Sequence, residues 1–376
     1  MNSRERIFAA FDLEEPDRVP VFDWGFLDNL SNFRNVENVL GRTIWAKFNQ
    51  ASFSARASPE ILDALIECCI RVGLDMTAPH LTSLPPKETS RTGLPKDILL
   101  DEWGMKWHLD IDFSGNPRTW YDGPAVENVE DLDSYIMPDP YEQGRMEAIR
   151  YFVKKAKEKG LVPAGTISSG AIGLILSIEK TALAFYKNPE ALERYMDRLF
   201  KYCSEIGKAE IDGVEIIIGG YEIMLFCDRK GPMVNPKMLR KYVFPRLQNY
   251  VSDLKKHGLQ FYVAHIDGNC TQLLDDFINI GFDAIHPIER PSMDLGYVKE
   301  RWGDKICIMG NVDCGETLVH GTVIDVQREV RECIAAAAKG GGYILSSSDS
   351  LHGGVKTENF ITMVKSTHKY GVYPIK

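Results

Sequence analysis

Short apolar runs alternate along the chain with longer stretches of helical spacing. The run FYVA at 261–264 is too short for a helix and rich in residues that favour strands. Apolar residues at 273–280 instead recur at the three- and four-residue spacing of a helix, which Gly281 ends. A second short apolar run follows at 282–286. The pattern therefore predicts a strand–helix–strand unit between 260 and 291.

The same alternation covers most of the chain. Each strand-like run precedes a helix-length segment, and these runs begin near residues 74, 161, 213, 260, 282, 305 and 342. Regular alternation of this kind predicts a parallel sheet. With an eighth strand that the pattern does not resolve, it favours an α/β fold of the (β/α)8 TIM-barrel type. A doubly wound open sheet is the alternative, but no G-x-G-x-x-G or phosphate-loop pattern follows any run.

The remaining predicted bounds follow from the same spacing. The strands outside the unit above are expected at 73–80, 161–167, 213–218, 305–309 and 341–345. Helical spacing also extends over one long stretch, 172–210, and over the last turns of the chain, 357–369.

Two segments lie outside the alternation. Residues 3–13 predict an N-terminal helical extension, and 18–24 form a brief extended segment. Residues 81–125 are rich in Pro, Gly, Trp and charge, and they alternate around 103–110, which predicts an inserted excursion with one or two hairpins. No internal repeat or low-complexity linker divides the chain, so residues 1–376 are expected to form a single domain.

Composition and net charge argue against some classes of binding partner. With 44% hydrophobic residues the chain can bury a sizeable core, and its net charge of −9 argues against nucleic acid or an anionic membrane as the main partner. No apolar run reaches the length of a membrane span, and the N-terminus has no signal-peptide core, so we expect a cytoplasmic protein. The eight cysteines form no C-x-x-C pair and are expected to be reduced and mostly structural.

Polar residues follow nearly every predicted strand, and in a parallel barrel the carboxyl ends of the strands converge on one mouth. A histidine with several carboxylates suits a divalent metal bound through nitrogen and oxygen, or paired acids for proton transfer. The residues in question are His80, Ser168, Glu222, His265, Asp267, Glu289, Asn311, Asp313, Asp349 and His352.

Each of these residues also has a structural interpretation. Asp267 precedes Gly-Asn and can form a turn, and Asp349 lies among serines where it can accept backbone hydrogen bonds. Glu289 can pair with a neighbouring arginine, and Asn311 and Asp313 can lock the loop after their strand. The histidines can bond to backbone carbonyls. The number of such residues at strand ends is what favours a site.

Four stretches of the chain match a known family: RERIFAAFDLEEPDRVPV at 4–21, HIDGNCTQLLDDFINIGFDAIHPIE at 265–289, GDKICIMGNVDCGETLVHGT at 303–322 and GGGYILSSSDSLHGGVKTENF at 340–360. On these stretches the chain resembles the uroporphyrinogen decarboxylase superfamily, which includes corrinoid- and coenzyme M-dependent methyltransferases. The resemblance implies a (β/α)8 barrel with its site at the carboxyl ends of the strands.

The resemblance divides by chemistry. Decarboxylases of the family carry an arginine-rich N-terminal motif that binds the substrate carboxylates, but the corresponding stretch here, 21–28, has no arginine. The methyltransferase branch binds zinc through a His-x-Cys pair, a Glu after the next strand and a late Cys. Aligned on those motifs, His265 and Glu289 are kept, whereas the two thiolates become Asp267 and Asp349.

Replacing thiolates by carboxylates leaves more positive charge on a metal and favours polarisation of a hard ether or alcohol oxygen. The resemblance therefore implies the first methyltransferase of a corrinoid system, which moves a methyl group from an O-methyl donor, such as an aryl methyl ether, to Co(I) of a corrinoid. The chain shows no D-x-H-x-x-G pattern, so the corrinoid is expected on a separate partner protein.

On this interpretation the polar residues divide into four groups. These are catalytic His265, Glu289 and Asp349; cofactor-binding Asn311, Asp313 and His352; substrate-binding His80, Ser168 and Glu222; and zinc-binding His265, Asp267, Glu289 and Asp349.

Two other functions remain open at this point. One is metal-free decarboxylation of a carboxylated tetrapyrrole, in which Asp75 or Asp349 faces the pyrrole nitrogens. The other is a barrel that binds a small ligand or a corrinoid protein without catalysis.

Overall fold

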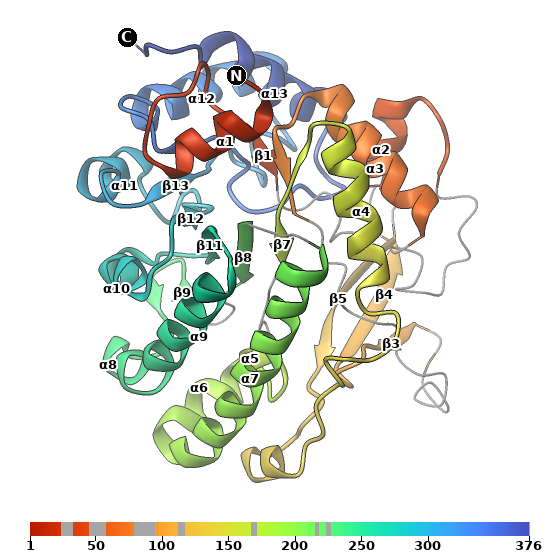
Figure 1. Cartoon of the computed structure of the whole chain (residues 1–376), viewed down its shortest axis with the longest axis vertical. Helices are drawn as coiled ribbons and strands as arrows, with labels where there is room; N and C mark the ends of the chain where they lie inside the picture. Colours follow the sequence, from red (N-terminus) through yellow and green to blue (C-terminus); the bar gives the residue numbers. More distant parts are fainter. Residues whose placement is uncertain are drawn as a thin grey trace.

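The structure, a computed structural model, surrounds a set of short parallel strands with helices, and both chain termini lie at the top of Figure 1. The described residues are 1–23, 33–44, 58–78, 95, 97–111, 117–166, 171–214, 218–222 and 227–375.

The central strands pair in parallel throughout. One run of neighbours is β14–β13–β12–β11–β8–β7 and the other is β1–β2–β6. Only Ala164 separates β6 from β7, and a parallel bridge between Val21 and Leu345 links the β1 end to the β14 end. The pairings therefore run in a ring, in a TIM-barrel-like arrangement. The strands of this ring are β1 (Phe22–Asp23), β2 (Met76–Thr77), β6 (Val162–Pro163), β7 (Gly165–Thr166), β8 (Ile218–Glu222), β11 (Phe261–His265), β12 (Ala284–His286), β13 (Cys307–Met309) and β14 (Tyr343–Ile344).

The strand missing from the sequence pattern is β1. It lies in the segment predicted only as extended, where Pro20 interrupts the apolar run just before its two buried residues. Another prediction, the strand at 213–218, was misplaced, and residues 215–217 lie outside the described residues. Helix α7 continues to Val214, and β8 instead occupies Ile218–Glu222. Two glycines in β8 give it little intrinsic strand preference, but the strand pairs with β7 on one side and β11 on the other.

Helices lie around the ring of strands (Figure 1). They are α1 (Ser3–Phe11), α2 (Phe33–Leu40), α3 (Pro59–Val72), α4 (Glu147–Glu158), α5 (Ala171–Leu174), α6 (Ile178–Lys187), α7 (Pro189–Val214), α8 (Pro236–Met238), α9 (Phe244–His257), α10 (Leu274–Ile280), α11 (Leu295–Trp302), α12 (Val323–Ala337) and α13 (Thr357–Tyr370). The single helical stretch expected at 172–210 is in fact α5, α6 and α7. Ser177 caps α6 with its side chain, and Asn188–Pro189 separates α6 from α7, because proline favours the first turn of a new helix.

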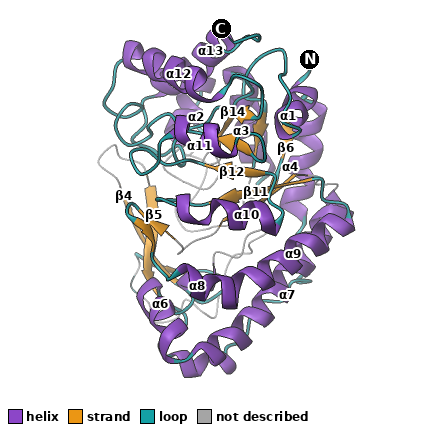
Figure 2. Cartoon of the chain, turned by 90° about the vertical axis from the view of Figure 1, so that its left-hand side faces the viewer, coloured by secondary structure: helices purple, strands orange, loops and turns teal. Residues whose placement is uncertain are grey.

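The predicted hairpin excursion is confirmed. Strands β3 (Ile98–Leu100), β4 (Lys106–Ile111) and β5 (Pro117–Gly123) form an antiparallel sheet in which Leu99 pairs with Trp107 and Trp107 with Tyr121. This sheet lies to one side of the ring, as Figure 2 shows. The Tyr121 hydroxyl donates to the Leu174 carbonyl at 2.8 Å, which fastens the sheet to α5.

The inside of the ring is apolar, and α1 covers its N-terminal end. Side chains from the strands, Val263 and Ala284 among them, form one buried cluster with Ile7, Ala10 and Phe11 of α1. Phe11 stacks on Phe261 at the start of β11, with ring centroids 4.7 Å apart. Because α1 covers that end, only the carboxyl ends of the strands remain for a site.

A network of charges ties α1 to the start of β2. Asp75 is buried, and it accepts hydrogen bonds from Arg6 at 2.7 Å, from Arg18 at 2.8 Å and from the Val21 N–H at 3.0 Å. Arg6 also pairs with Asp17 at 2.7 Å, which lowers the pKa of Asp17. Asp75 therefore lies before its strand and away from the carboxyl ends, so its predicted role in an alternative decarboxylation was wrong.

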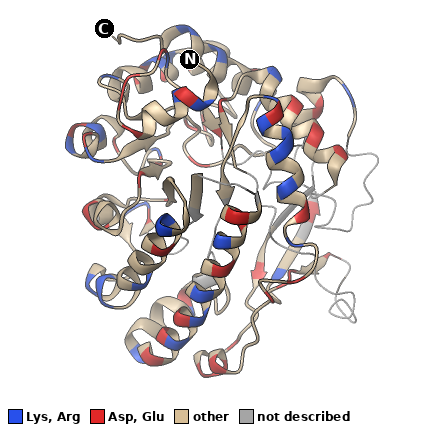
Figure 3. Cartoon of the chain, in the orientation of Figure 1, with Lys and Arg blue, Asp and Glu red and all other residues tan. Residues whose placement is uncertain are grey.

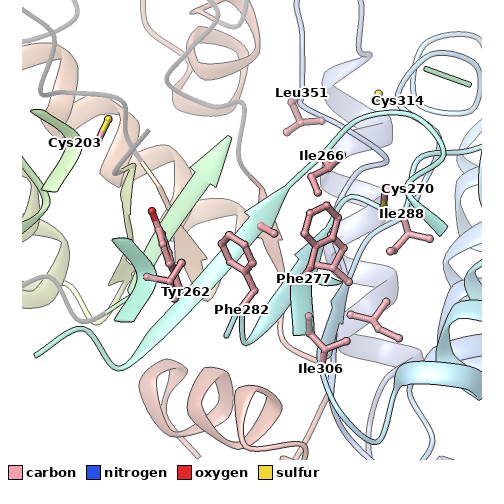
Figure 4. Close-up of a cluster of buried hydrophobic side chains, with 14 of the residues drawn as sticks. Cys203, Tyr262, Ile266, Cys270, Phe277, Phe282, Ile288, Ile306, Cys314 and Leu351 are labelled. Carbon is pink, nitrogen blue, oxygen red and sulfur yellow. The ribbon is translucent and has the colours of Figure 1, made fainter. Parts of the chain in front are cut away.

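A second core lies between the strands and the outer helices. Figure 4 shows Tyr262, Phe277 and Phe282 together, from β11, α10 and the segment before β12. Each large apolar side chain buried in this way contributes about 1.5–3 kcal/mol to the free energy of folding. The eight cysteines are free thiols and seven are buried, in agreement with a structural role.

The outer helices carry acidic and basic residues in mixture, as Figure 3 shows. Within the described part of the chain, no helix combines the length and the apolar character that crossing a bilayer would need.

Candidate active site

His265 ends β11 and lies at the mouth of the ring. Alternation along the strand places Val263 in the inner cluster, and His265 has the same parity as Val263. The histidine is buried. The apolar strand β11 thus places the imidazole of His265 at the carboxyl end of the apolar interior.

Two carboxylates lie near Nε2 of the His265 imidazole. Asp267 Oδ1 lies 3.6 Å and Asp349 Oδ1 3.8 Å from His265 Nε2. One potential ligand atom from each of these three residues lies within 4.8 Å of the other two. We name His265, Asp267 and Asp349 the close group. The group joins residues far apart in the sequence, as predicted for His265, Asp267 and Asp349.

The loop that carries Asp349 is fastened to its neighbours. The buried carboxylate of Asp23, at the end of β1, accepts hydrogen bonds from the Ser347 and Leu351 N–H groups, each at 3.3 Å. The Ser348 hydroxyl accepts from the Cys314 N–H at 3.2 Å. The position of Asp349 is therefore set by backbone contacts to β1 and to the loop after β13.

The loop that carries Asp267 is shaped by a glycine and a glutamate. Gly268 has φ +78°, and a Cβ there would lie 2.5 Å from the Asp228 carbonyl oxygen, so a larger residue does not fit. Glu289 accepts a hydrogen bond from the Gly268 N–H, and its other oxygen lies 3.9 Å from Arg229 Nε. Glu289 thus reaches the site loop, whereas the close group consists of His265, Asp267 and Asp349. The predicted binding of a metal by Glu289 stays a prediction.

Burial and negative charge act together on Asp349. Restricted contact with bulk water, and next the charge of Asp267, raise the pKa of Asp349 to about 6 against the opposing effect of His265. A positive charge beside this carboxyl group would favour its ionised form. A bound cation would supply that charge.

His286, at the end of β12, lies behind His265. The two residues pair across the parallel strands, and their Nδ1 atoms are 2.7 Å apart. His286 is fully buried, and burial followed by the charge of His265 holds its pKa well below the usual value. His286 is therefore neutral at physiological pH.

The predicted cofactor-binding residues make hydrogen bonds within the loops, as their structural interpretation expects, and their binding of a cofactor stays a prediction. Asn311 is buried, donates to the Ile288 carbonyl at 2.8 Å and accepts from Arg290 at 3.2 Å. Asp313 Oδ1 accepts from the N–H groups of Gly315 and Glu316, at 2.8 and 2.9 Å.

His352 follows Asp349 in the loop after β14. Its Nε2 lies 3.0 Å from the Cys314 carbonyl oxygen and its Nδ1 accepts from the Gly354 N–H at 3.1 Å, which makes Nε2 the protonated nitrogen. These contacts use both ring nitrogens within the loops.

Two of the three predicted substrate-binding residues, His80 and Ser168, lie outside the described residues. The third, Glu222, ends β8, where its backbone is paired with His265. The backbone of Glu222 is thus at the level of the site.

Sequence reasoning missed His286 and Asp23. A signal for His286 was available, since it ends its predicted strand as His265 does. Asp23 had no comparable signal, because β1 itself was not resolved by the pattern.

The close group can hold a divalent cation. One imidazole and two carboxylates are a donor set that zinc and other first-row metals accept. The raised pKa of Asp349 also fits, because a cation would relieve the repulsion between Asp349 and Asp267. Without a cation, the same carboxyl group can hold or release a proton near pH 6.

The chain is similar to proteins of two activities. It is 25% identical over 268 residues to a uroporphyrinogen decarboxylase of Psychromonas ingrahamii, covering 66% of this chain and 72% of that protein. It is 21% identical over 329 residues to a methylated-thiol–coenzyme M methyltransferase of Methanosarcina mazei, covering 85% of this chain and 79% of that protein.

A solved structure supports the fold. A methyltransferase from Methanosarcina mazei superposes with a TM-score of 0.72 at 19% identity, covering 98% of this chain and 99% of that one. The likeness places the chain in a TIM-barrel-like fold and, at this identity, says nothing more. A sequence profile described as uroporphyrinogen decarboxylase (URO-D) matches residues 90–370. The chain therefore belongs to the uroporphyrinogen decarboxylase family.

Proposed function

We propose that this protein is a methyltransferase that moves a methyl group from an O-methyl donor, such as an aryl methyl ether, to the Co(I) corrinoid of a separate protein. The observation that carries the proposal is the donor set at the mouth: His265, Asp267 and Asp349 within 4.8 Å of one another. Two hard carboxylates and one imidazole suit a cation that acts on oxygen rather than on a thiol.

The transfer balances without any further reagent. The oxygen–methyl bond breaks and leaves its electron pair on the oxygen, while Co(I) supplies the pair for the new cobalt–carbon bond. The released phenolate takes a proton from water. A divalent cation, zinc in the first instance, would supply positive charge next to the departing oxygen.

The residues of the chain have separate tasks in this proposal. His265, Asp267 and Asp349 hold the cation, and Asp23 and Gly268 keep the two acid-bearing loops in place. Glu289 braces the Asp267 loop through the Gly268 N–H. The apolar interior beneath His265 excludes water from one side of the group.

Metal analysis and a methyl-transfer assay test the proposal together. Purified protein is expected to bind about one zinc per chain and to convert cob(I)alamin to methylcobalamin with a methoxybenzoate as donor, followed by absorbance. The Asp267→Asn variant is expected to lose both properties. Wild-type protein that binds no metal and transfers no methyl group would defeat the proposal.

Decarboxylation is the second candidate. Similarity to uroporphyrinogen decarboxylases favours it, and the pKa of about 6 at Asp349 suits a group that moves protons. Turnover of a carboxylated porphyrinogen by metal-free protein, lost in Asp349→Asn, would establish it over methyl transfer.

We also infer that the ring is a closed (β/α)8 barrel in a single domain. The inference is supported by the bridge between Val21 and Leu345, since it returns the parallel pairings from β14 to β1.

A further inference from the structure

The two histidines at the mouth share a hydrogen bond that fixes how their protons are arranged. His265 and His286 face each other through Nδ1 atoms 2.7 Å apart, with ring centroids at 4.9 Å. A hydrogen bond between two such nitrogens needs one proton and one lone pair. The two rings therefore cannot both carry a proton on Nδ1, nor can both lack one.

The outer nitrogen of His265 selects between the two arrangements. Its Nε2 is the atom that faces Asp267 and Asp349, at 3.6 and 3.8 Å. A cation bound there needs the Nε2 lone pair, so the ring proton of neutral His265 must be on Nδ1. His265 then donates to His286, which must present an Nδ1 lone pair.

His286 is held in the geometry that this requires. Its backbone pairs with His265, and the Ile266 N–H donates to the His286 carbonyl at 2.9 Å. Phe22 packs edge-on against its ring, with centroids 5.6 Å apart, and the residue has no exposed surface. Metal-binding histidines usually receive this support from a carboxylate or a carbonyl group.

We propose that His286 is a positioning residue of the site: it accepts the Nδ1 proton of His265 and so holds His265 in the tautomer whose Nε2 can bind a cation. The inference rests on the proposed function in one respect, which is that a cation binds at His265 Nε2. It assigns a new role to a residue that lies outside the close group of His265, Asp267 and Asp349.

Two variants separate acceptor from shape. His286→Asn keeps an oxygen where the Nδ1 acceptor was, whereas His286→Phe keeps a flat ring of similar size and removes the acceptor. Affinity for Co(II), read from its visible absorption, and for zinc by competition is expected to fall about 10- to 100-fold in His286→Phe. In His286→Asn it is expected to stay within about threefold of wild type. His257→Asn, at an exposed histidine paired with Asp212, is the matched control and should leave affinity unchanged.

Nitrogen-15 NMR of wild-type protein gives a readout that does not depend on how the variants fold. With zinc bound, His265 is expected to show a protonated Nδ1 and a metal-bound Nε2, and His286 a protonated Nε2. The reverse tautomers, or equal affinity in a folded His286→Phe variant, overturn the role of His286 while the proposed function stands. Absence of zinc binding by wild type overturns both.

Discussion

The two ends of the ring both carry acidic side chains, but these acids are balanced differently at the two ends. At the N-terminal end, Asp75 is met by two guanidinium groups and a backbone N–H at hydrogen-bond distance. At the carboxyl end, Asp267 and Asp349 approach one imidazole at 3.6 and 3.8 Å, which exceeds a good hydrogen bond. At the N-terminal end the charge of Asp75 is balanced by its partners, and α1 covers that end of the ring. The carboxyl end carries excess negative charge at an open mouth, which suits a cation.

The largest effect is expected at the open end. His265→Ala should abolish metal binding and methyl transfer, because it removes the only nitrogen ligand of the close group. Metal content by mass spectrometry and the cob(I)alamin assay measure this. His257→Ala, on the outside of α9, is the control; a His265→Ala variant with full metal content would contradict the comparison.

At the closed end, we expect a change in stability rather than in binding. Asp75→Ala leaves the buried Arg6 without its buried carboxylate partner and should lower the free energy of unfolding by about 3–5 kcal/mol. Urea denaturation measures the loss. Asp133→Ala, in an exposed pair with Arg194, should leave the stability nearly unchanged. A folded Asp75→Ala protein with unchanged stability but weaker metal binding would reverse the assignment of the two ends.

The sequence predicted more of the ring than of its mouth. Apolar runs with short-range periodicity located β11, β12, β13 and β14, because each strand alternates between the inner and outer cores. The pattern missed β1, which lies in the segment predicted only as extended, and it misplaced β8, since a glycine-rich strand depends on pairing with its neighbours rather than on its own pattern.

The candidate site also has features that the sequence predicted and features that it did not. His265, Asp267 and Asp349 were predictable because strand ends of a parallel barrel meet at one mouth. For Asn311 and Asp313 the sequence left both loop-locking and cofactor binding open, and only their contacts show that the loops use their polar atoms. The pairing of His265 with His286 depends on strand register, which the sequence alone does not fix.

The pH dependence of binding should separate Asp349 from the other ligands. Because the pKa of Asp349 is raised to about 6, protons compete with the cation below that pH. The ratio of wild-type to Asp349→Asn affinity should therefore fall by up to about tenfold per pH unit below pH 6 and stay level above it. Calorimetric titration with zinc measures both proteins, and a ratio independent of pH would contradict the raised pKa.

The same shift has a consequence for stability without metal. The native state holds the Asp349 proton up to about pH 6, whereas the unfolded state releases it near pH 4. Metal-free wild type should therefore lose stability relative to Asp349→Asn as the pH rises from about 4 to 6, with no further change above. Melting temperatures of the two metal-free proteins, compared at pH 4.5 and 7, measure this difference.

The smallest effect is expected at Glu289, and it decides between bracing and binding. Glu289→Gln keeps an oxygen that can accept from the Gly268 N–H but removes the charge. If Glu289 braces the Asp267 loop, zinc affinity should change less than about threefold, because the loop keeps its hydrogen bond. Glu289→Ala removes that bond and should weaken binding further. A loss of zinc affinity of more than about 100-fold in Glu289→Gln would instead identify Glu289 as a fourth ligand. The carboxyl end would then have three acidic ligands rather than the two of the close group.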